Sequence, residues 1–391
     1  MTRSTILATL LCIMLAGCDA LQHQALKTYM AVEKGLDADE GTERVETTAQ
    51  AFNITALTDE LEFPWGFDFL PDGKMLITER PGRLVLLNPS NGDITPIKGV
   101  PAVYYKGQGG LLDVLVHPEF ASNQWIYLSA AVEVGDALQT TQVVRYRLNA
   151  DTLSDATMIF EATPAVKSNT HFGSALLFDN DGHLFITMGD RRQRHLAQDL
   201  GTSLGKVFRL QDDGSIPADN PYVGTKGALP GIYSWGHRNP QGLAIDRKTG
   251  RIWALEHGPQ GGDEINLLRP GGNYGWPVIT YGEEYGGGAI GEGTEKPGME
   301  QPIYYYVPSI GTAGLAYYDG DALPAWRGSL FAAGLRSFSV SRVTLEGDRA
   351  TDEERLLESY RFRARNLKQG PDGNLYLLTE NGGIIKIAPV E

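Results

Sequence analysis

A short pattern recurs six times along this chain of 391 residues, and it constrains the fold more than any other feature of the sequence. Each copy has a Gly or Asn turn, a short apolar strand, a loop that carries polar residues, and a second strand. Spacings of roughly 40 to 65 residues with two or more strands each are typical of the blades of a β-propeller. The copies lie at 71–87, 122–148, 181–210, 249–268, 327–345 and 371–387.

The pattern predicts an all-β, six-bladed β-propeller over residues 51–391. The chain after its first 50 residues shows no sustained helical period, and a β-sandwich would not explain six copies. We expect a strand at 51–57 to close the ring by joining the last blade, since the strand at 384–387 would otherwise leave an open sheet edge.

Polar residues gather where one strand of each copy ends. We expect that strand to be the innermost of its blade, so that its loops converge on the axis and build one site from many blades. These loops hold Glu79-Arg80, Asp190-Arg191, Glu256-His257-Gly258, Leu335-Arg336 and Thr379-Glu380.

The first residues have the pattern of a bacterial export signal. A basic n-region precedes an apolar run at 6–16, which is too short to span a bilayer as a helix. The LAGC ending at 15–18 resembles a lipobox, which implies cleavage before Cys18 and lipidation of that residue. An ordinary secretory signal with an incidental Cys18 is the alternative.

These features predict three regions: a lipoprotein signal peptide at 1–17, a polar tether at 18–50 and the propeller at 51–391. The protein is then expected to be lipid-anchored on the periplasmic side of a bacterial membrane. Asp19 resembles a signal that retains lipoproteins at the inner membrane. Cys12 is lost with the signal and Cys18 carries lipid, so no thiol is left for a disulfide, a metal site or a nucleophile.

The balance of charge excludes one class of partner. With 34 basic and 48 acidic residues the formal net charge is −14, which argues against a nucleic-acid backbone or an anionic membrane surface. Basic residues that gather in one pocket of such a protein therefore need a local reason.

The segment 236–277 is the densest in chemically active residues. Its glycines and prolines fix irregular backbone whose carbonyls, with carboxylates, can hold hard cations such as calcium. Gly258-Pro259 and the Asp263-Glu264-Tyr274 cluster indicate two calcium sites, while Arg238-Asn239 suits an anionic or carbonyl-bearing planar ligand. The alternative is a surface ion pair between Arg238 and Asp263, with the glycines serving only as turns.

Several motifs together resemble one known family. They are GQGGLLDVLVHPEF at 107–120, NTHFGSALLF at 169–178, MGD at 188–190, GKVFRL at 205–210, and GHRNPQG and GGNYGWP within 236–277. They resemble the soluble aldose sugar dehydrogenases that depend on pyrroloquinoline quinone (PQQ), part of the glucose/sorbosone dehydrogenase group of six-bladed propellers. The resemblance covers residues from about 55 to 388.

The resemblance implies roles for five polar residues. His171 is similar to the base that takes the proton from the C1 hydroxyl of an aldose as hydride passes to PQQ, which yields a lactone. Asp190 resembles the carboxylate that orients this base. Arg238 and Asn239 resemble the pair that polarises the quinone carbonyl, and Gln108 resembles an amide that contacts the cofactor.

Cations and metal ligands follow from the same resemblance. Arg336, Arg363 and Arg365 resemble a clamp for the PQQ carboxylates. At the position of Arg336 the relatives have Lys, a point charge where guanidinium is a fork. Gly258 and Pro259 resemble the carbonyl donors to a calcium ion on PQQ. The second calcium cluster would comprise Glu264 and Tyr274 with Asp263. The Tyr306–Ser309 stretch departs from the family pattern and leaves sugar preference open.

Other readings stay open at the level of sequence. A calcium-dependent hydrolase of the lactonase type would use the same axial position, and a non-catalytic calcium-binding propeller would need no base. The electron acceptor, a quinone or a cytochrome, is not encoded in any segment. The sequence does not decide between monomer and homodimer, or whether Gln193 or Gln198 contacts the cofactor.

Overall fold

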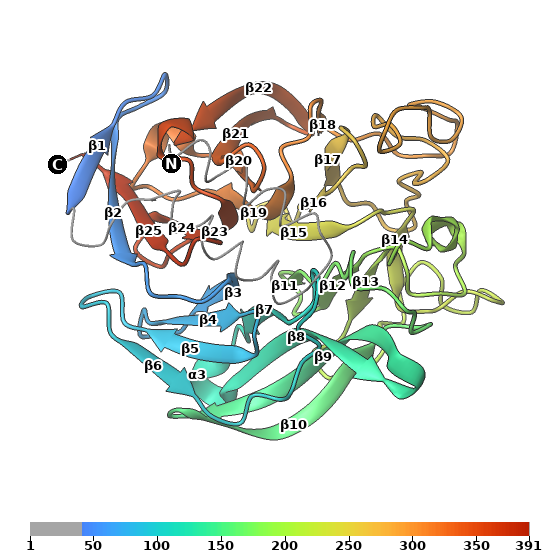
Figure 1. Cartoon of the computed structure of the whole chain (residues 1–391), viewed down its shortest axis with the longest axis horizontal. Helices are drawn as coiled ribbons and strands as arrows, with labels where there is room; N and C mark the ends of the chain where they lie inside the picture. Colours follow the sequence, from blue (N-terminus) through green and yellow to red (C-terminus); the bar gives the residue numbers. More distant parts are fainter. Residues whose placement is uncertain (1–40, 391) are drawn as a thin grey trace, which may run out of the picture.

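Six antiparallel sheets are arranged around a common axis in the computed structural model, which describes residues 41–390 (Figure 1). Five sheets have four strands and one has five. The six-bladed, all-β propeller predicted from the repeats is confirmed. The predicted signal peptide, Cys18, Asp19 and most of the tether lie outside the described residues and stay predictions.

The blades follow one another along the chain, and each begins with its innermost strand. The first comprises β3 (Pro64–Phe69), β4 (Met75–Glu79), β5 (Arg83–Leu87) and β6 (Ile94–Ile97), and the second β7 (Leu111–Val116), β8 (Trp125–Val134), β9 (Leu138–Asn149) and β10 (Thr152–Glu161). The third comprises β11 (Leu176–Phe178), β12 (Leu184–Met188), β13 (Lys206–Leu210) and β14 (Ile232–Trp235), and the fourth β15 (Pro240–Ile245), β16 (Ile252–Glu256), β17 (Asp263–Leu267) and β18 (Tyr304–Tyr306). The fifth comprises β19 (Thr312–Tyr318), β20 (Ser329–Gly334), β21 (Ser339–Glu346) and β22 (Arg349–Leu356).

The sixth blade joins the two ends of the described chain. Its strands β23 (Ala364–Gln369), β24 (Leu375–Thr379) and β25 (Ile384–Pro389) are followed outward by β2 (Phe52–Thr58), which pairs antiparallel with β25. The expected closing strand at 51–57 is therefore confirmed. Figure 1 shows the blue N-terminal strands beside the red C-terminal ones.

One expected boundary is wrong. The strand β1 (Thr42–Val45) lies inside the predicted tether, yet it pairs with β2 and extends the sixth blade to five strands. Thr48 continues this attachment, because its backbone N–H donates to Glu354 of the fifth blade at 2.8 Å. The folded part of the chain thus begins at least nine residues before the expected boundary at 51.

The second strand of five blades is buried along its whole length, because neighbouring blades cover both of its faces. The residues of β4, β12, β16, β20 and β24 are all buried, and they are mostly β-branched, aromatic or leucine side chains. By contrast, β2 alternates between buried and half-buried residues, as expected of an outer strand. The apolar core therefore lies between blades.

The five polar loops follow the second strands of their blades, not the innermost strands as predicted from the sequence. Glu79, Glu256 and Thr379 end the second strands β4, β16 and β24. In an antiparallel sheet the second strand ends where the innermost strand begins. The loops therefore meet the starts of the inner strands at one end of the axis, and convergence of residues from many blades still follows.

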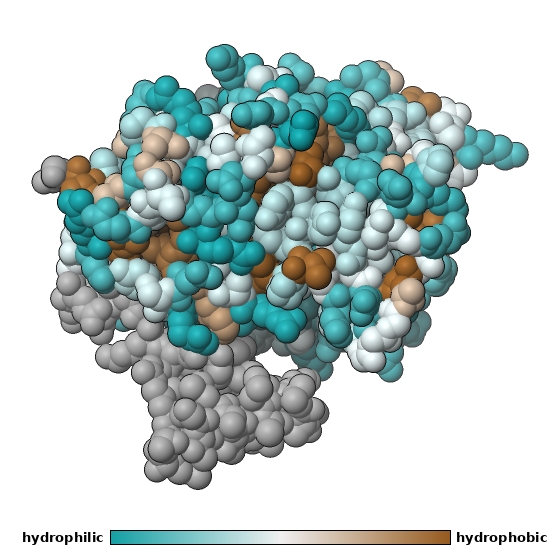
Figure 2. Space-filling model, turned by 90° about the horizontal axis from the view of Figure 1, so that it is seen from above, coloured by the Kyte–Doolittle hydropathy of each residue, from teal (hydrophilic) through white to brown (hydrophobic). Residues whose placement is uncertain are grey.

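The surface shows no single large apolar area on the side seen in Figure 2, where hydrophobic residues form small separate groups among hydrophilic ones. The large hydrophobic side chains that are exposed in residues 41–390 include Tyr285, Tyr305 and Val307, which cluster in one stretch of sequence. No helix within the described part of the chain is long and apolar enough to cross a membrane.

Ring closure generates the first prediction. The buried ring of Phe52 on β2 meets the Trp326 ring edge-on, with 4.9 Å between centroids. Because Phe52→Ala leaves a cavity between the closing strand β2 and the fifth blade, we expect the free energy of unfolding to fall by about 3–5 kcal/mol. Urea unfolding followed by tryptophan fluorescence measures the change. Asn53→Ala, on the other face of the same strand, is the matched control. An equal loss of stability in both variants would contradict a stabilising role for the Phe52–Trp326 contact.

Candidate active site

Polar residues from the third, fourth and sixth blades meet at the end of the axis where inner strands begin. His171 precedes β11, Arg238 and Asn239 precede β15, and Arg363 precedes β23. Second strands contribute Asp190 after β12. The structure therefore brings together most of the side chains to which the sequence assigned a role.

His171 and Asp190 form a buried hydrogen-bonded pair. The His171 Nδ1 lies 2.7 Å from Asp190 Oδ1, and both residues are at most 7% exposed. Burial lowers the pKa of His171, and Arg238 adds to this effect while the bond to Asp190 opposes it. Burial alone would raise the pKa of Asp190, but His171 and Arg238 hold it below its usual value. Asp190 is thus ionised and His171 neutral near pH 7.

Two further groups fix this pair, and sequence reasoning missed one of them. The Trp276 indole Nε1 donates to Asp190 Oδ2 at 2.8 Å, so both carboxylate oxygens are held. The GGNYGWP motif marked this Trp only by resemblance, and its distance from Asp190 along the chain hid the contact. Gln108 behaves differently from the expectation of a plain cofactor contact, because its Oε1 accepts the His171 backbone N–H at 2.7 Å.

Arg238 and Asn239 are positioned by contacts with Glu256, His257 and Gly173. The Arg238 backbone N–H donates to Glu256 Oε2 at 2.7 Å, and the guanidinium donates to the His257 carbonyl. Asn239 accepts the Gly173 N–H through Oδ1, while its buried Nδ2 has no hydrogen-bond partner among the described residues. An unpaired buried donor is costly in a folded protein. Asn239 therefore points to a ligand with an acceptor at this position.

A second group of cations lies across the site. Arg365 is fully buried, and its guanidinium donates to Gln241 and packs 4.5 Å from the centre of the Trp65 ring. Burial lowers the pKa of Arg365 to about 10. Its Nε has no hydrogen-bond partner within residues 41–390. Arg365 thus has a donor left for an anionic ligand.

Arg363 is less free than expected. Two of its nitrogens bind Glu380, at 2.6 and 2.8 Å. Burial alone would raise the pKa of Glu380, but the charges of Arg363, Arg365 and Arg80 lower it to about 2. Arg336 is exposed and lines a groove of about 350 Å³ between the fourth and fifth blades. The predicted clamp therefore consists of one buried cation, one ion-paired cation and one cation at the rim.

The turn at Gly258 and Pro259 is tightly packed. A Cβ at Gly258 would lie 2.2 Å from the Gly262 carbonyl oxygen, so only glycine fits this approach. Asp263 holds the turn, since its Oδ1 accepts the Gly258 N–H at 2.9 Å. Its Oδ2 accepts from Ser309 and Gly311. Asp263 thus joins the Gly258 turn to the loop at 309–311. The structure does not place it in a metal cluster with Glu264.

Alternation along β17 explains this separation, because successive side chains of a strand point to opposite faces. Glu264 faces Glu256 of β16, its register partner. Burial raises the pKa of Glu264 to about 8, and the nearby Glu256 adds to this effect. Both carboxylates line a cavity of about 10 Å³, which has about the room of one water-sized sphere. Two carboxylates around so small a cavity suit a cation.

Tyr274 lines the same cavity, but its hydroxyl is not available as a ligand. The hydroxyl donates to the Leu267 carbonyl at 2.6 Å and accepts the Arg269 N–H at 2.9 Å. Its ring stacks on His237, with 4.6 Å between centroids. The structure thus assigns Tyr274 a packing role beside the Glu256–Glu264 pair.

The amide of Gln198 is already engaged. Its Nε2 donates to Asn273 Oδ1 at 3.0 Å and to the Trp276 carbonyl at 2.8 Å. Gln193 begins the turn after Asp190, because its backbone N–H donates to the Asp190 carbonyl at 2.7 Å. Gln198 therefore supports the Trp276 loop.

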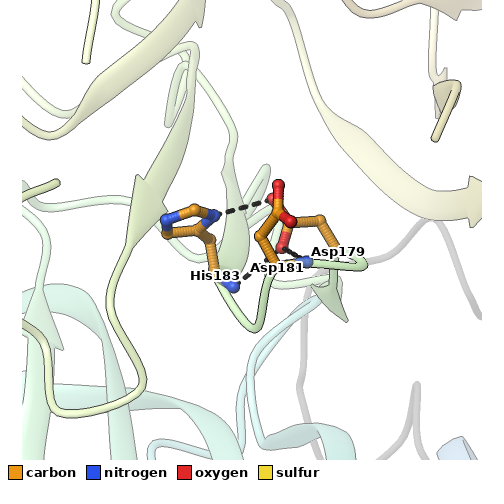
Figure 3. Close-up of side chains that lie close together, drawn as sticks. All are labelled: Asp179, Asp181 and His183. Atoms are coloured by element: carbon orange, nitrogen blue, oxygen red, sulfur yellow. Dashed lines mark hydrogen bonds and ion pairs between the residues drawn. The ribbon is translucent and has the colours of Figure 1, made fainter. Parts of the chain in front are cut away.

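One acidic cluster outside the site has the spacing of metal ligands, namely Asp179, Asp181 and His183 (Figure 3). Asp179 accepts the backbone N–H groups of Asp181 and His183 and binds His183 Nδ1 at 2.9 Å. The guanidinium of Arg209 lies 3.3 Å from His183 Nε2, where a cation would be repelled. The cluster is therefore a side-chain-capped turn between β11 and β12.

A separate hollow lies away from these residues. A cavity of about 540 Å³ follows the inner strands and is lined by Asp68, Asp113, Gln241 and Lys368 among others. Gln241 also contacts Arg365 and His257, so these three side chains separate the axial cavity from the site. His171, Asp190 and Arg238 do not line it.

Comparison with known proteins agrees with this geometry. The family model of glucose/sorbosone dehydrogenases matches residues 61–386. Aldose sugar dehydrogenase YliI of Escherichia coli (strain K12) is 42% identical over 345 residues, which is 86% of this chain and 93% of that protein.

Two solved structures are similar over nearly their whole length. The apo-form of the soluble aldose sugar dehydrogenase from Escherichia coli is 40% identical with a TM-score of 0.84, over 87% of this chain and 100% of that chain. The PQQ-bound aldose sugar dehydrogenase from Streptomyces coelicolor is 28% identical with a TM-score of 0.71, over 89% of this chain and 98% of that chain. The chain, with its six blades and its buried His171–Asp190 pair, belongs to the glucose/sorbosone dehydrogenase family.

Proposed function

We propose that the protein oxidises aldose sugars at C1 to lactones with PQQ as cofactor and calcium as metal. The observation that carries the proposal is the neutral His171, held by Asp190, beside the Arg238–Asn239 pair with its unpaired amide donor. A base next to a preorganised donor for developing negative charge is what removal of hydride and proton from an alcohol needs. A relative of known structure is PQQ-bound, which supports the choice of cofactor.

The residues present fit PQQ, which carries carboxylates on a planar ring system. The chain is strongly acidic, yet this site holds Arg238, Arg363 and Arg365, and Arg365 Nε and Asn239 Nδ2 lack partners among the described residues. Trp65 and Trp276 line the cationic groups with aromatic surface, at 4.5 Å from Arg365 and 5.4 Å from Arg238. Fixed donors and flat apolar walls are the features by which a planar anion is recognised.

Calcium fits at two places. The carbonyls of the Gly258–Pro259 turn are the oxygen ligands expected beside the cofactor. The cavity between Glu256 and Glu264 is the second, and Asn266 is the sole side chain in residues 41–390 that donates to the Glu264 carboxylate. A cation there would compensate the charge of the Glu264 carboxylate, whose pKa burial and the neighbouring Glu256 raise.

The chain's own residues supply the acid–base chemistry. Because ionised Asp190 accepts from Nδ1–H, the lone pair of His171 lies on Nε2, which can take the proton of the C1 hydroxyl. Trp276 and Gln108 hold the carboxylate and the backbone, so the base needs little reorganisation. Arg238 and Asn239 present donors that can contribute roughly 3 to 4 kcal/mol to the barrier reduction. PQQ, when bound, supplies the two-electron acceptor.

A calcium-dependent hydrolase or a binding propeller accounts for less of this geometry. A hydrolase has no use for the cations Arg363 and Arg365 across the site from its base, and a binding module has no use for the His171–Asp190 pair. We also propose that electrons leave to a quinone or cytochrome, and that a lipid anchor at Cys18 holds the protein at the periplasmic face of the membrane.

Reconstitution tests the proposal directly. We expect metal-stripped protein starting at Asp19 to reduce an artificial dye with aldoses only after both PQQ and calcium are added. His171→Ala should lower kcat by about 10²–10⁴-fold, because the proton acceptor is lost. Asp179→Asn, in the turn far from the base, is the control. Dye reduction without PQQ, or failure to bind PQQ, would reject the proposal.

The Asp190 carboxylate gives a pH-dependent prediction. Its bond and charge raise the pKa of His171 against the effect of burial, so Asp190→Asn should lower that pKa further. The acidic limb of the kcat/KM profile lies below pH 6.5 in the parent protein and should move to still lower pH in the variant, while kcat falls by about 10²-fold or more. An unchanged profile would show that Asp190 does not act on the base.

Glu264 links metal to stability. Its pKa rises from 4.5 in the unfolded chain to about 8 in the metal-free fold, so its contribution to stability is complete below pH 4.5 and is lost as the pH rises through 8. With chelator present, Tm should fall between pH 5 and 8, and calcium should abolish the fall. Glu264→Gln should be insensitive to both pH and calcium in this range. Calcium stabilisation that persists in the variant would place the ion elsewhere.

A further inference from the structure

The three carbonyl groups that precede His171 are all bound by groups from outside their own segment. Asn169 O accepts the Gln108 N–H at 2.8 Å. The carbonyls of Ser168 and Thr170, on either side of it, both accept from the guanidinium of Arg191. The backbone that carries the base is therefore held residue by residue.

Arg191 is well placed for this because it directly follows Asp190 in the chain. Its Nε donates to Thr170 O at 2.9 Å, its Nη2 donates to Ser168 O, and its Nη1 donates to Gln139 O at 3.3 Å. The guanidinium carbon lies 3.7 Å from the centre of the Phe172 ring. Asp190 thus holds the ring of the base, and the next residue holds its backbone.

The hydrogen bonds from Arg191 matter because the backbone of His171 is strained. Its φ is +55°, in the left-handed region that costs a non-glycine residue about 1–2 kcal/mol. Arg191 itself has φ +52°. Such conformations persist only where the surroundings enforce them. Without donors on Ser168 O and Thr170 O, the segment can relax and turn the imidazole away from Asp190.

Burial of the charged Arg191 guanidinium costs free energy of folding, which argues for a role beyond stability. The side chain is 1% exposed, no carboxylate pairs with it in residues 41–390, and burial lowers its pKa to about 10. A methionine side chain can pack its sulfur against the Phe172 ring that now lies below the guanidinium, but it cannot donate to the three carbonyls that Arg191 holds.

We propose that Arg191 is a positioning residue that fixes the left-handed backbone of His171 and so aims its imidazole. The proposal rests on the proposed function for its kinetic readout only. It adds Arg191, whose guanidinium donates to the carbonyls of Ser168 and Thr170. Asp190 cannot replace it, because an ionised carboxylate only accepts hydrogen bonds.

The test compares Arg191→Met, Arg191→Lys and Arg191→Ala with the parent protein. Arg194→Ala is the matched control, because the exposed guanidinium of Arg194 pairs with Glu284. A first readout needs no cofactor: the downfield proton NMR signal of His171 Nδ1–H bound to Asp190 in the apo protein. A second readout is the split between kcat and KM in the reconstituted enzyme. A third is the affinity for PQQ by fluorescence titration.

We expect Arg191→Met to stay folded, to lose the His171 signal and to lower kcat by about 10²-fold, the scale of a misplacement of about 1 Å. KM and PQQ affinity should change by less than about threefold, since no binding group is removed. Arg191→Lys, with a single nitrogen for two carbonyls, should fall between. Millimolar guanidinium ion should restore both signal and turnover in Arg191→Ala.

Two outcomes would overturn the proposal. One is an intact signal with full turnover in Arg191→Met. The other is loss of turnover without rescue of Arg191→Ala while the NMR signal is retained. If Arg191→Met does not fold, rescue of Arg191→Ala decides alone. A parent protein that never oxidises sugars would reject the proposed function, yet the apo NMR comparison would still decide the role of Arg191.

Discussion

Closure of the ring is the constraint on which the rest of this molecule depends. No blade carries the site alone, since His171, Arg238 and Arg363 precede the inner strands of different blades. They meet because the β2–β25 pairing brings the first and last blades together and fixes the diameter of the ring. The strands of the apolar core are buried by their neighbours on both sides, so stability and site geometry have the same origin.

Within that frame the site is organised by buried charge. In an acidic protein, Arg365 lies against the Gln241 amide and the Trp65 ring, and Arg191 against backbone carbonyls and the Phe172 ring. Neither forms an ion pair with a carboxylate in residues 41–390. Asp190 is the anionic counterpart, with each oxygen bound by a ring nitrogen. Groups held this rigidly do not need to reorganise when a ligand arrives, which is the physical basis of preorganised electrostatics.

The fold and much of the site could be predicted from the sequence because both leave local signals. Turn residues before apolar strands marked the repeats, and the motifs around His171 and Arg238 marked the His171–Asp190 and Arg238–Asn239 pairs. The innermost strand was assigned wrongly, since strand order within a blade leaves no trace in a single copy. Trp276, Gln108 and Arg191 act across 63 to 86 residues or through backbone carbonyls, and composition cannot show such contacts. Asp263 and Glu264 are adjacent in sequence, yet their side chains point to opposite faces of the strand, so that Asp263 binds the Gly258 turn and Glu264 faces Glu256.

The five-stranded blade has a mechanical consequence. Any pull on the chain from its N-terminal side reaches the four-residue strand β1 before it reaches β2. Peeling β1 from β2 breaks a short outer ladder, and the Thr48–Glu354 contact is loaded next. The longer β2–β25 ladder therefore bears load last. The outer strand β1 is therefore the first to detach under force, while the ring and the site within it stay closed.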